Sequence, residues 1–155
     1  MKKLLLTTAL VGFAGAAQAQ DVPLGIIFGF TGPLESITPA MAEAAEMAIA
    51  EVNESGQFSL GTVTSVRGDD GCIDSGLAVA TAERLVTSDR VLGIVGADCS
   101  GVTGAILQNV ARPNGVVMIS PSATSPALST AEDNGLFFRT APSDARQGQV
   151  VADIL

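Results

Sequence analysis

The chain has 155 residues, of which 47% are hydrophobic and 15% are charged, and its formal net charge at pH 7 is −8. This apolar content excludes a disordered chain, and the length suits a single domain. The excess of acidic over basic residues argues against nucleic acid and anionic membranes as partners.

The first 19 residues have the organisation of a secretory signal peptide. Lysines at positions 2 and 3 form a short basic region, residues 4–16 an apolar stretch, and residues 17–19 a small-residue cleavage site. The apolar stretch is too short to span a bilayer, and no stop-transfer pattern follows it. We therefore expect cleavage after Ala19, a mature chain of residues 20–155 in the periplasm, and no membrane insertion after cleavage.

Five apolar, β-rich runs alternate with helical patterns along the rest of the chain. The predicted strands are residues 22–30, 62–67, 91–97, 116–120 and 136–142. The predicted helices lie within residues 38–56, 75–88, 101–115 and 143–155. Alternation at this spacing predicts an α/β fold, a doubly wound parallel sheet with helices on both faces and right-handed crossovers.

The first predicted helix carries clear end signals. Thr38 is expected to cap it, Pro39 to occupy its first position, and Gly56 to lie just past its end. Apolar residues at three-four spacing predict the face that packs on the sheet. These residues are Met41, Ala44, Ala45, Ala48, Ile49 and Val52.

The residues that most catalytic centres need are missing. The chain contains no histidine, tyrosine or tryptophan, so a Ser-His-Asp or Cys-His centre cannot be built within it. The glycines after the first and third predicted strands do not complete a G-x-G-x-x-G pattern, and two cysteines are too few for a structural zinc site. We therefore expect no enzyme activity, no cofactor and no metal.

Three carboxylates, those of Asp69, Asp70 and Asp74, cluster in the loop after the second predicted strand. Such a cluster is able to bind a cation, but acidic side chains in a loop are more often simply solvated. We interpret it as a solvated acidic loop.

Two cysteines follow neighbouring strands of the predicted sheet. Cys72 comes after the second strand and Cys99 after the third, and in a parallel sheet both loops emerge from the same edge. An even pair in an oxidising compartment indicates a disulfide, and without its signal peptide the chain has no lysine or histidine to activate a free thiol. We predict a disulfide between Cys72 and Cys99.

Ser100 lies where ligands bind in sheets of this kind, beyond the carboxyl end of a strand and at the start of a helix. The loop after the fourth strand, residues 120–129, is crowded with hydroxyl groups, and hydroxyls with backbone N–H groups suit a carboxylate. For Ser122, Thr124 or Ser125 taken singly, capping or turn formation is the alternative. Two such loops on one sheet edge favour a binding site for a small anion.

Four motifs together resemble the first lobe of a type I periplasmic substrate-binding protein, in the branched-chain amino acid branch that feeds ABC importers. They are "GIIFGFTGPLESITPAMAEAAEMAIAEVN", "IVGADCSGVTGAI", "VVMISPSATSPALS" and "FFRTAPSDARQGQVVADIL". The resemblance covers essentially the whole chain after the signal peptide. It implies a flavodoxin-like strand order, a Cys72–Cys99 disulfide, and a ligand held between two lobes. The second lobe is expected to be missing, because the sequence ends about where relatives cross into it.

By the same resemblance, Ser100 contacts the α-carboxylate of an amino-acid ligand. Ala123 and Thr124, with the adjacent Ser122, contribute backbone and hydroxyl groups to the carboxylate and ammonium ends. Ile37 stands where family members often carry an aromatic residue that contacts the ligand side chain.

The expected function is an extracytoplasmic solute-binding protein that delivers a branched-chain amino acid, or a similar ligand, to the permease subunits of an ABC importer. The ligand-binding domain of a sensory receptor is the alternative, because such receptors often use this fold. An extracytoplasmic enzyme on the same sheet is a further alternative, which the missing histidine disfavours.

Overall fold

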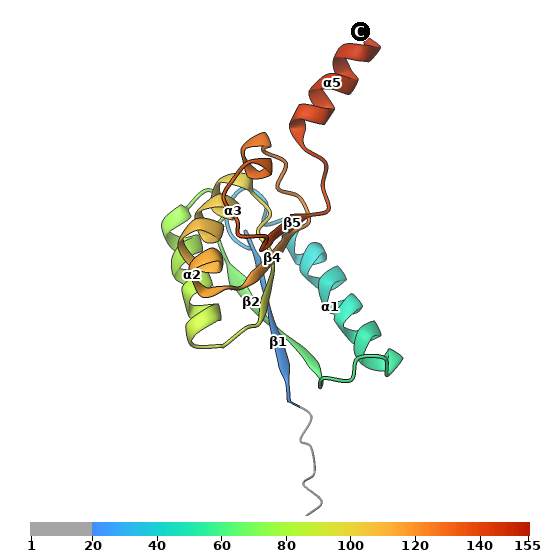
Figure 1. Cartoon of the computed structure of the whole chain (residues 1–155), viewed down its shortest axis with the longest axis vertical. Helices are drawn as coiled ribbons and strands as arrows, with labels where there is room; N and C mark the ends of the chain where they lie inside the picture. Colours follow the sequence, from blue (N-terminus) through green and yellow to red (C-terminus); the bar gives the residue numbers. More distant parts are fainter. Residues whose placement is uncertain (1–19) are drawn as a thin grey trace, which may run out of the picture.

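The computed structural model describes residues 20–155, so the predicted signal peptide lies outside the described residues. One parallel sheet of five strands forms the centre of the molecule (Figure 1). The strands are β1 (Val22–Phe28), β2 (Val63–Asp69), β3 (Gly93–Gly96), β4 (Val117–Ser120) and β5 (Phe137–Arg139). Their order across the sheet is β2-β1-β3-β4-β5. The predicted α/β fold and flavodoxin-like strand order are confirmed.

The helices connect successive strands. They are α1 (Thr38–Ser55), α2 (Ser75–Thr87), α3 (Ser100–Ile106), η1 (Leu107–Ala111), α4 (Arg112–Asn114), η2 (Pro126–Ser129) and α5 (Asp144–Ile154). The predicted helix at 101–115 is therefore continuous but contains the π-helical turn η1, and η2 is a 3₁₀ turn that the sequence did not indicate. Figure 1 shows α2 and α3 on one side of the sheet, α1 on the other, and α5 extending away from the rest. None of the helices within residues 20–155 is both long and apolar enough to cross a bilayer.

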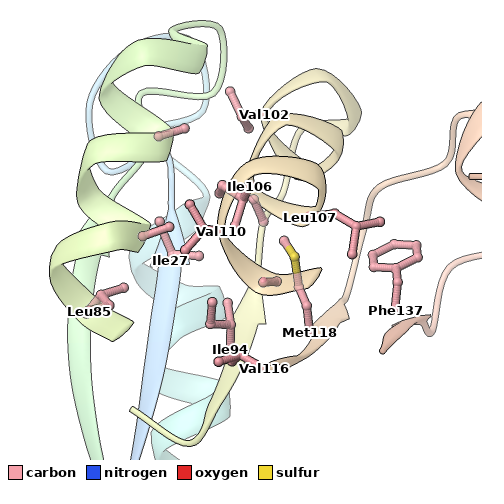
Figure 2. Close-up of a cluster of buried hydrophobic side chains, with 14 of the residues drawn as sticks. Ile27, Leu85, Ile94, Val102, Ile106, Leu107, Val110, Val116, Met118 and Phe137 are labelled. Carbon is pink, nitrogen blue, oxygen red and sulfur yellow. The ribbon is translucent and has the colours of Figure 1, made fainter. Parts of the chain in front are cut away.

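The main hydrophobic core lies between the sheet and the layer formed by α2, α3 and η1 (Figure 2). Alternate residues of the strands face it, as Ile94 of β3 and Met118 of β4 do, because side chains point to opposite faces along a strand. Removal of these apolar side chains from water is the main favourable contribution to folding. The helical part of the core consists of Ala78, Ala82, Leu85, Val102, Ile106, Leu107, Val110, Ala111 and Leu128.

The start of α1 differs from the prediction. Ile37, not Thr38, occupies the N-cap position, and no side chain caps the helix. Thr38 is instead completely buried, and its Oγ1 donates a hydrogen bond of 2.8 Å to the carbonyl of Gly29. The hydroxyl therefore ties the start of α1 to the end of β1, because it faces the sheet rather than the exposed first turn of the helix.

The predicted apolar face of α1 is only partly correct. Met41, Ala45 and Ile49 pack against the second core cluster, but Ala44, Ala48 and Val52 are exposed. The reason is that α1 is the single described helix on its side of the sheet and leaves an apolar groove of about 390 Å³ beside it. Ala48 and Val52 line this groove instead of a closed core.

The same side of the sheet is open over β3, β4 and β5. Three apolar residues of β4 and β5 face away from the main core on this side. Each of them, Val117, Ile119 and Phe138, is at least 39% exposed. β4 alternates between exposed and buried residues along its length. The core of the described chain is thus thick on the α2–α3 side and thin on the α1 side.

Candidate ligand-binding site

The loops that follow β1, β2, β3 and β4 all emerge at the carboxyl edge of the sheet, where open α/β sheets bind ligands. Hydrogen bonds link each of these loops to a neighbouring one. The candidate site of the sequence analysis falls within this edge, in the loops after β3 and β4.

Ser100, the first residue of α3, connects those two loops. Its Oγ accepts hydrogen bonds from the backbone N–H groups of Thr124 and Ser125, each at 3.1 Å. A hydroxyl oxygen has two lone pairs and one proton. Because both lone pairs are used here, the proton of Ser100 is available to donate to an anion in front of the edge.

The other hydroxyls of the loop after β4 also bridge between segments. Ser122 Oγ donates to the carbonyl of Asp98 at 3.0 Å, and Thr124 Oγ1 donates to Asp144 Oδ2 at 3.0 Å. Neither acts as a helix cap in this arrangement. Ser125 does act as a cap, because its Oγ accepts from the N–H of Ala127 at the start of η2. The capping alternative therefore holds for Ser125 and not for Ser122 or Thr124.

Ala123 lies at the base of this loop and is completely buried. Its N–H donates to Ser120 Oγ at 2.9 Å, and its carbonyl accepts from Arg139 Nη1 at 3.2 Å. Both backbone groups of Ala123 are thus used within the protein. The structure brings Ser100, Ser122, Ala123 and Thr124 together as one hydrogen-bonded unit.

Arg139 is a residue of this unit that the sequence analysis missed. It ends β5 and donates to the carbonyls of Ala123 and Ser125, and to the side chain of Ser129. Through these three hydrogen bonds Arg139 holds the loop after β4 in place. An arginine at the end of an otherwise apolar strand was the available signal, since a planar guanidinium is suited to satisfy several carbonyls at once.

Ile37 lies apart from this hydrogen-bonded unit. It precedes α1 in the loop after β1, and its side chain is 55% exposed at the same edge of the sheet. An exposed isoleucine beside polar loops is an apolar surface available to a ligand.

The disulfide between Cys72 and Cys99 is formed, as predicted, and its Cα atoms are 5.2 Å apart. It joins the loop after β2 to the residue directly before Ser100. The Sγ atoms and a carboxylate oxygen of Asp98 lie within 4.8 Å of one another. Because the sulfurs are bonded to each other, they offer no thiolate ligands for a metal.

The interpretation of Asp69, Asp70 and Asp74 as a solvated acidic loop is wrong for Asp70, which is buried, and holds for Asp74, which is exposed. Asp69 accepts from the N–H and Oγ1 of Thr31, at 3.1 and 2.6 Å, and so joins the loops after β1 and β2. Asp74 is the N-cap of α2 and accepts from two backbone N–H groups of its first turn. Asp70 is completely buried. Each carboxylate has a separate structural partner, and sequence proximity did not reveal this.

The environments of the first two carboxylates shift their pKa values in opposite directions. Partial burial acts to raise the pKa of Asp69, but hydrogen bonds from Thr31 and Gly71 outweigh it and lower the pKa below 3.8. Burial raises the pKa of Asp70 to about 7, with a smaller contribution from the negative charges of Asp98 and Asp69. The hydrogen bond from Cys72 N–H opposes that rise.

Comparison with known proteins agrees with the geometry. The family model described as "Receptor family ligand binding region" matches residues 40–155. The Leu/Ile/Val-binding protein of Escherichia coli K12 is 31% identical over 151 residues, which cover 97% of this chain and 40% of that protein. The leucine-, isoleucine-, valine-, threonine- and alanine-binding protein of Pseudomonas aeruginosa is 33% identical over 156 residues, 100% of this chain and 41% of that protein.

A solved structure with this fold is that of the branched-chain amino acid transporter substrate binding protein from Streptococcus pneumoniae in complex with isoleucine. Its TM-score is 0.72 at 30% identity, and the match covers 81% of this chain and 35% of that one. The chain therefore belongs to the family of receptor ligand-binding regions, and its sheet is that of a type I periplasmic binding protein. It spans about 40% of the length of the relatives it matches.

Proposed function

We propose that this chain is the first lobe of an extracytoplasmic solute-binding protein that delivers a branched-chain amino acid to an ABC importer. The observation that carries the proposal is the hydrogen-bonded unit of Ser100 and the loop after β4, which leaves the Ser100 hydroxyl proton free to donate. The identity of about 30% with named Leu/Ile/Val-binding proteins, over nearly the whole chain, supports the ligand class.

The proposed contacts divide between polar and apolar groups. Ser100 donates to one carboxylate oxygen of the amino acid. The hydroxyls of Ser122 and Thr124 bind the other polar atoms of the ligand, and for this they give up their hydrogen bonds to Asp98 and Asp144. Ile37, from the loop after β1, offers apolar area to the ligand side chain. A branched-chain side chain suits such a surface because burial of apolar area is favourable and needs no directional partner.

The proposed cellular role is binding followed by delivery, without a chemical step. In this proposal a second lobe closes over the ligand, and the closed form is the shape that the permease subunits recognise in the periplasm. The named relatives are binding proteins, and one is named as the binding protein of a transporter, which supports transport over sensing.

The test is calorimetric titration of the protein as its native host secretes it. Leucine, isoleucine and valine are titrated separately, with glutamate and lysine as charged comparisons. We expect binding of at least one branched-chain amino acid and none of the charged ones. Absence of binding for all three branched-chain amino acids would overturn the proposed ligand class.

A further inference from the structure

Two carboxyl groups lie buried beside the disulfide, and the proposed ligand site uses neither of them. Asp70 directly follows β2 and is completely buried, and Asp98 follows β3 and is 3% exposed. Within the described chain, the charged groups that act on the Asp70 carboxyl are both acidic, Asp98 and Asp69. Burial of two neighbouring carboxylates without a cation is unfavourable unless one of them is neutral.

Asp98 has the hydrogen bonds of an ionised carboxylate. Its Oδ2 accepts from the N–H of Gly29 at 2.9 Å, and its Oδ1 accepts from the N–H of Cys99 at 2.8 Å. Gly29 lies in the loop after β1, so Asp98 connects that loop to the loop after β3. Both oxygens are used as acceptors, which is the role that the charged form fills.

Asp70 has a different set of partners. Its Oδ1 accepts from the N–H of Cys72 at 2.7 Å, whereas its Oδ2 is buried without a hydrogen-bond partner among residues 20–155. An unpaired buried carboxylate oxygen costs free energy, and a protonated one becomes a donor instead. The acceptor beside it is the carboxylate of Asp98.

We propose that Asp70 is protonated in the folded protein and donates a hydrogen bond from Oδ2 to the carboxylate of Asp98. The two carboxyl groups then hold one proton between them, taken from solvent on folding. With that proton the pair joins three loops: the loop after β1 through Gly29, the loop after β2 through Cys72, and the loop after β3 through Cys99.

The proton makes folding stability depend on pH in a defined sense. Below pH 3.8 both the folded and the unfolded chain hold the proton, and the contribution is complete. Between about pH 4 and 7 only the folded state keeps it, so the stabilisation declines as pH rises and is lost above about pH 7. The inference stands independently of the proposed amino-acid binding, since that proposal assigns no ligand contact to the carboxyl group of Asp70 or Asp98.

The direct test is carbon-13 NMR of the side-chain carboxyl groups in the full chain labelled at aspartate. The resonance that is absent in Asp70→Asn identifies Asp70. We expect it to titrate near pH 7, and we expect Asp98→Asn to move that titration toward lower pH. In the unsubstituted protein, the absence of any aspartate carboxyl resonance that titrates near pH 7 would overturn the proposal, and this result needs no variant to be stable.

A second test follows the melting temperature from pH 5 to 8.5. The side-chain amide introduced by Asp70→Asn would keep an acceptor for the N–H of Cys72 and provide a permanent N–H donor for Asp98. We expect the melting temperature of the unsubstituted protein to fall by several degrees relative to this variant as pH rises. Asp74→Asn, an exposed carboxylate of the same loop, controls for the change in net charge. Parallel curves for Asp70→Asn and the unsubstituted protein would contradict the proposal.

Discussion

Ser100 Oγ accepts a hydrogen bond from the backbone N–H of Thr124 at 3.1 Å, although 24 residues separate the two in sequence. This contact makes one surface from the loops after β3 and β4, which the sequence places on different crossovers. It also determines what the serine is able to do. With its oxygen used as an acceptor, Ser100 is a donor toward any ligand.

The first prediction concerns this contact and the proposed ligand. In a form that binds a branched-chain amino acid, Ser100→Ala together with Thr124→Ala should weaken affinity roughly 10- to 100-fold. The reason is that a hydrogen bond to a charged carboxylate contributes about 1.5–3 kcal/mol. Calorimetry measures the effect. Ser59→Ala, an exposed serine between α1 and β2 at the opposite edge, is the matched control and should bind normally. Unchanged affinity in the double variant would remove Ser100 and Thr124 from the site.

Arg139 should support the loop after β4 through its shape as well as its charge. Arg139→Met removes the donors to Ala123, Ser125 and Ser129, and we expect a loss of about 1–3 kcal/mol in the free energy of unfolding. Arg139→Lys retains the charge but lacks the planar fork, so its loss should be intermediate. Urea denaturation measures both. Arg146→Met on the exposed helix α5 is the control, and an equal effect there would show that the bridging contacts contribute nothing.

The Cys72–Cys99 disulfide closes a loop with a sequence separation of 27 residues. By the chain-entropy model, its removal in Cys72→Ser with Cys99→Ser should cost about 3–4 kcal/mol of stability. Reduction of the unsubstituted protein should give a similar loss and should leave the double variant unaffected. Alkylation supplies the check on the bond itself, since two labels should appear only after reduction. Labelling without reduction would contradict the bond.

Asp69 should make folding stability depend on pH in the opposite sense to Asp70, because its pKa is lowered rather than raised. Its folded pKa lies below 3.8, so its stabilisation is complete above that pH and is lost as the pH falls through the folded value. Thr31→Val removes the 2.6 Å donor and should lower stability by about 1 kcal/mol at pH 7. The difference from the unsubstituted protein should shrink below pH 3.8, as chemical denaturation at several pH values will reveal. A difference that stays constant down to pH 2 would mean that Thr31 acts independently of the Asp69 charge.

Sequence periodicity was sufficient for the parallel α/β sheet, and the positions of Cys72 and Cys99 after two of its strands were sufficient for the disulfide. The strand order followed from the family resemblance, because alternation of strands and helices is compatible with more than one order. Periodicity was not sufficient for α1. The same three-four spacing includes Ala45, which packs on the sheet, and Ala48, which lines an open groove. The pattern does not say how much of the sheet and its neighbouring elements lies opposite the helix.

Asp70 and Asp74 show a second limit. Two aspartates four positions apart have the same chemistry in sequence, yet one is a buried acid and the other a helix cap, and tertiary contacts alone separate them.

The loops after β1, β2 and β3 lie close together at Gly29. A Cβ added there would lie 3.0 Å from the backbone nitrogen and Cβ of Cys72, and 3.3 Å from Asp98 Oδ2. These neighbours are held by the disulfide and by hydrogen bonds, so they have little freedom to move. Gly29→Ala should therefore lower the free energy of unfolding by about 1–3 kcal/mol, as overpacking of a tight site does.

The control for Gly29→Ala is Gly101→Ala, in the first turn of α3, where an added Cβ meets nothing within 4 Å. That variant should be neutral or more stable by up to about 1 kcal/mol, because alanine is the better helix former. Urea denaturation of both variants under identical conditions gives the comparison. If Gly29→Ala were as stable as Gly101→Ala, Cys72 and Asp98 would not pack against Gly29 as tightly as these distances indicate.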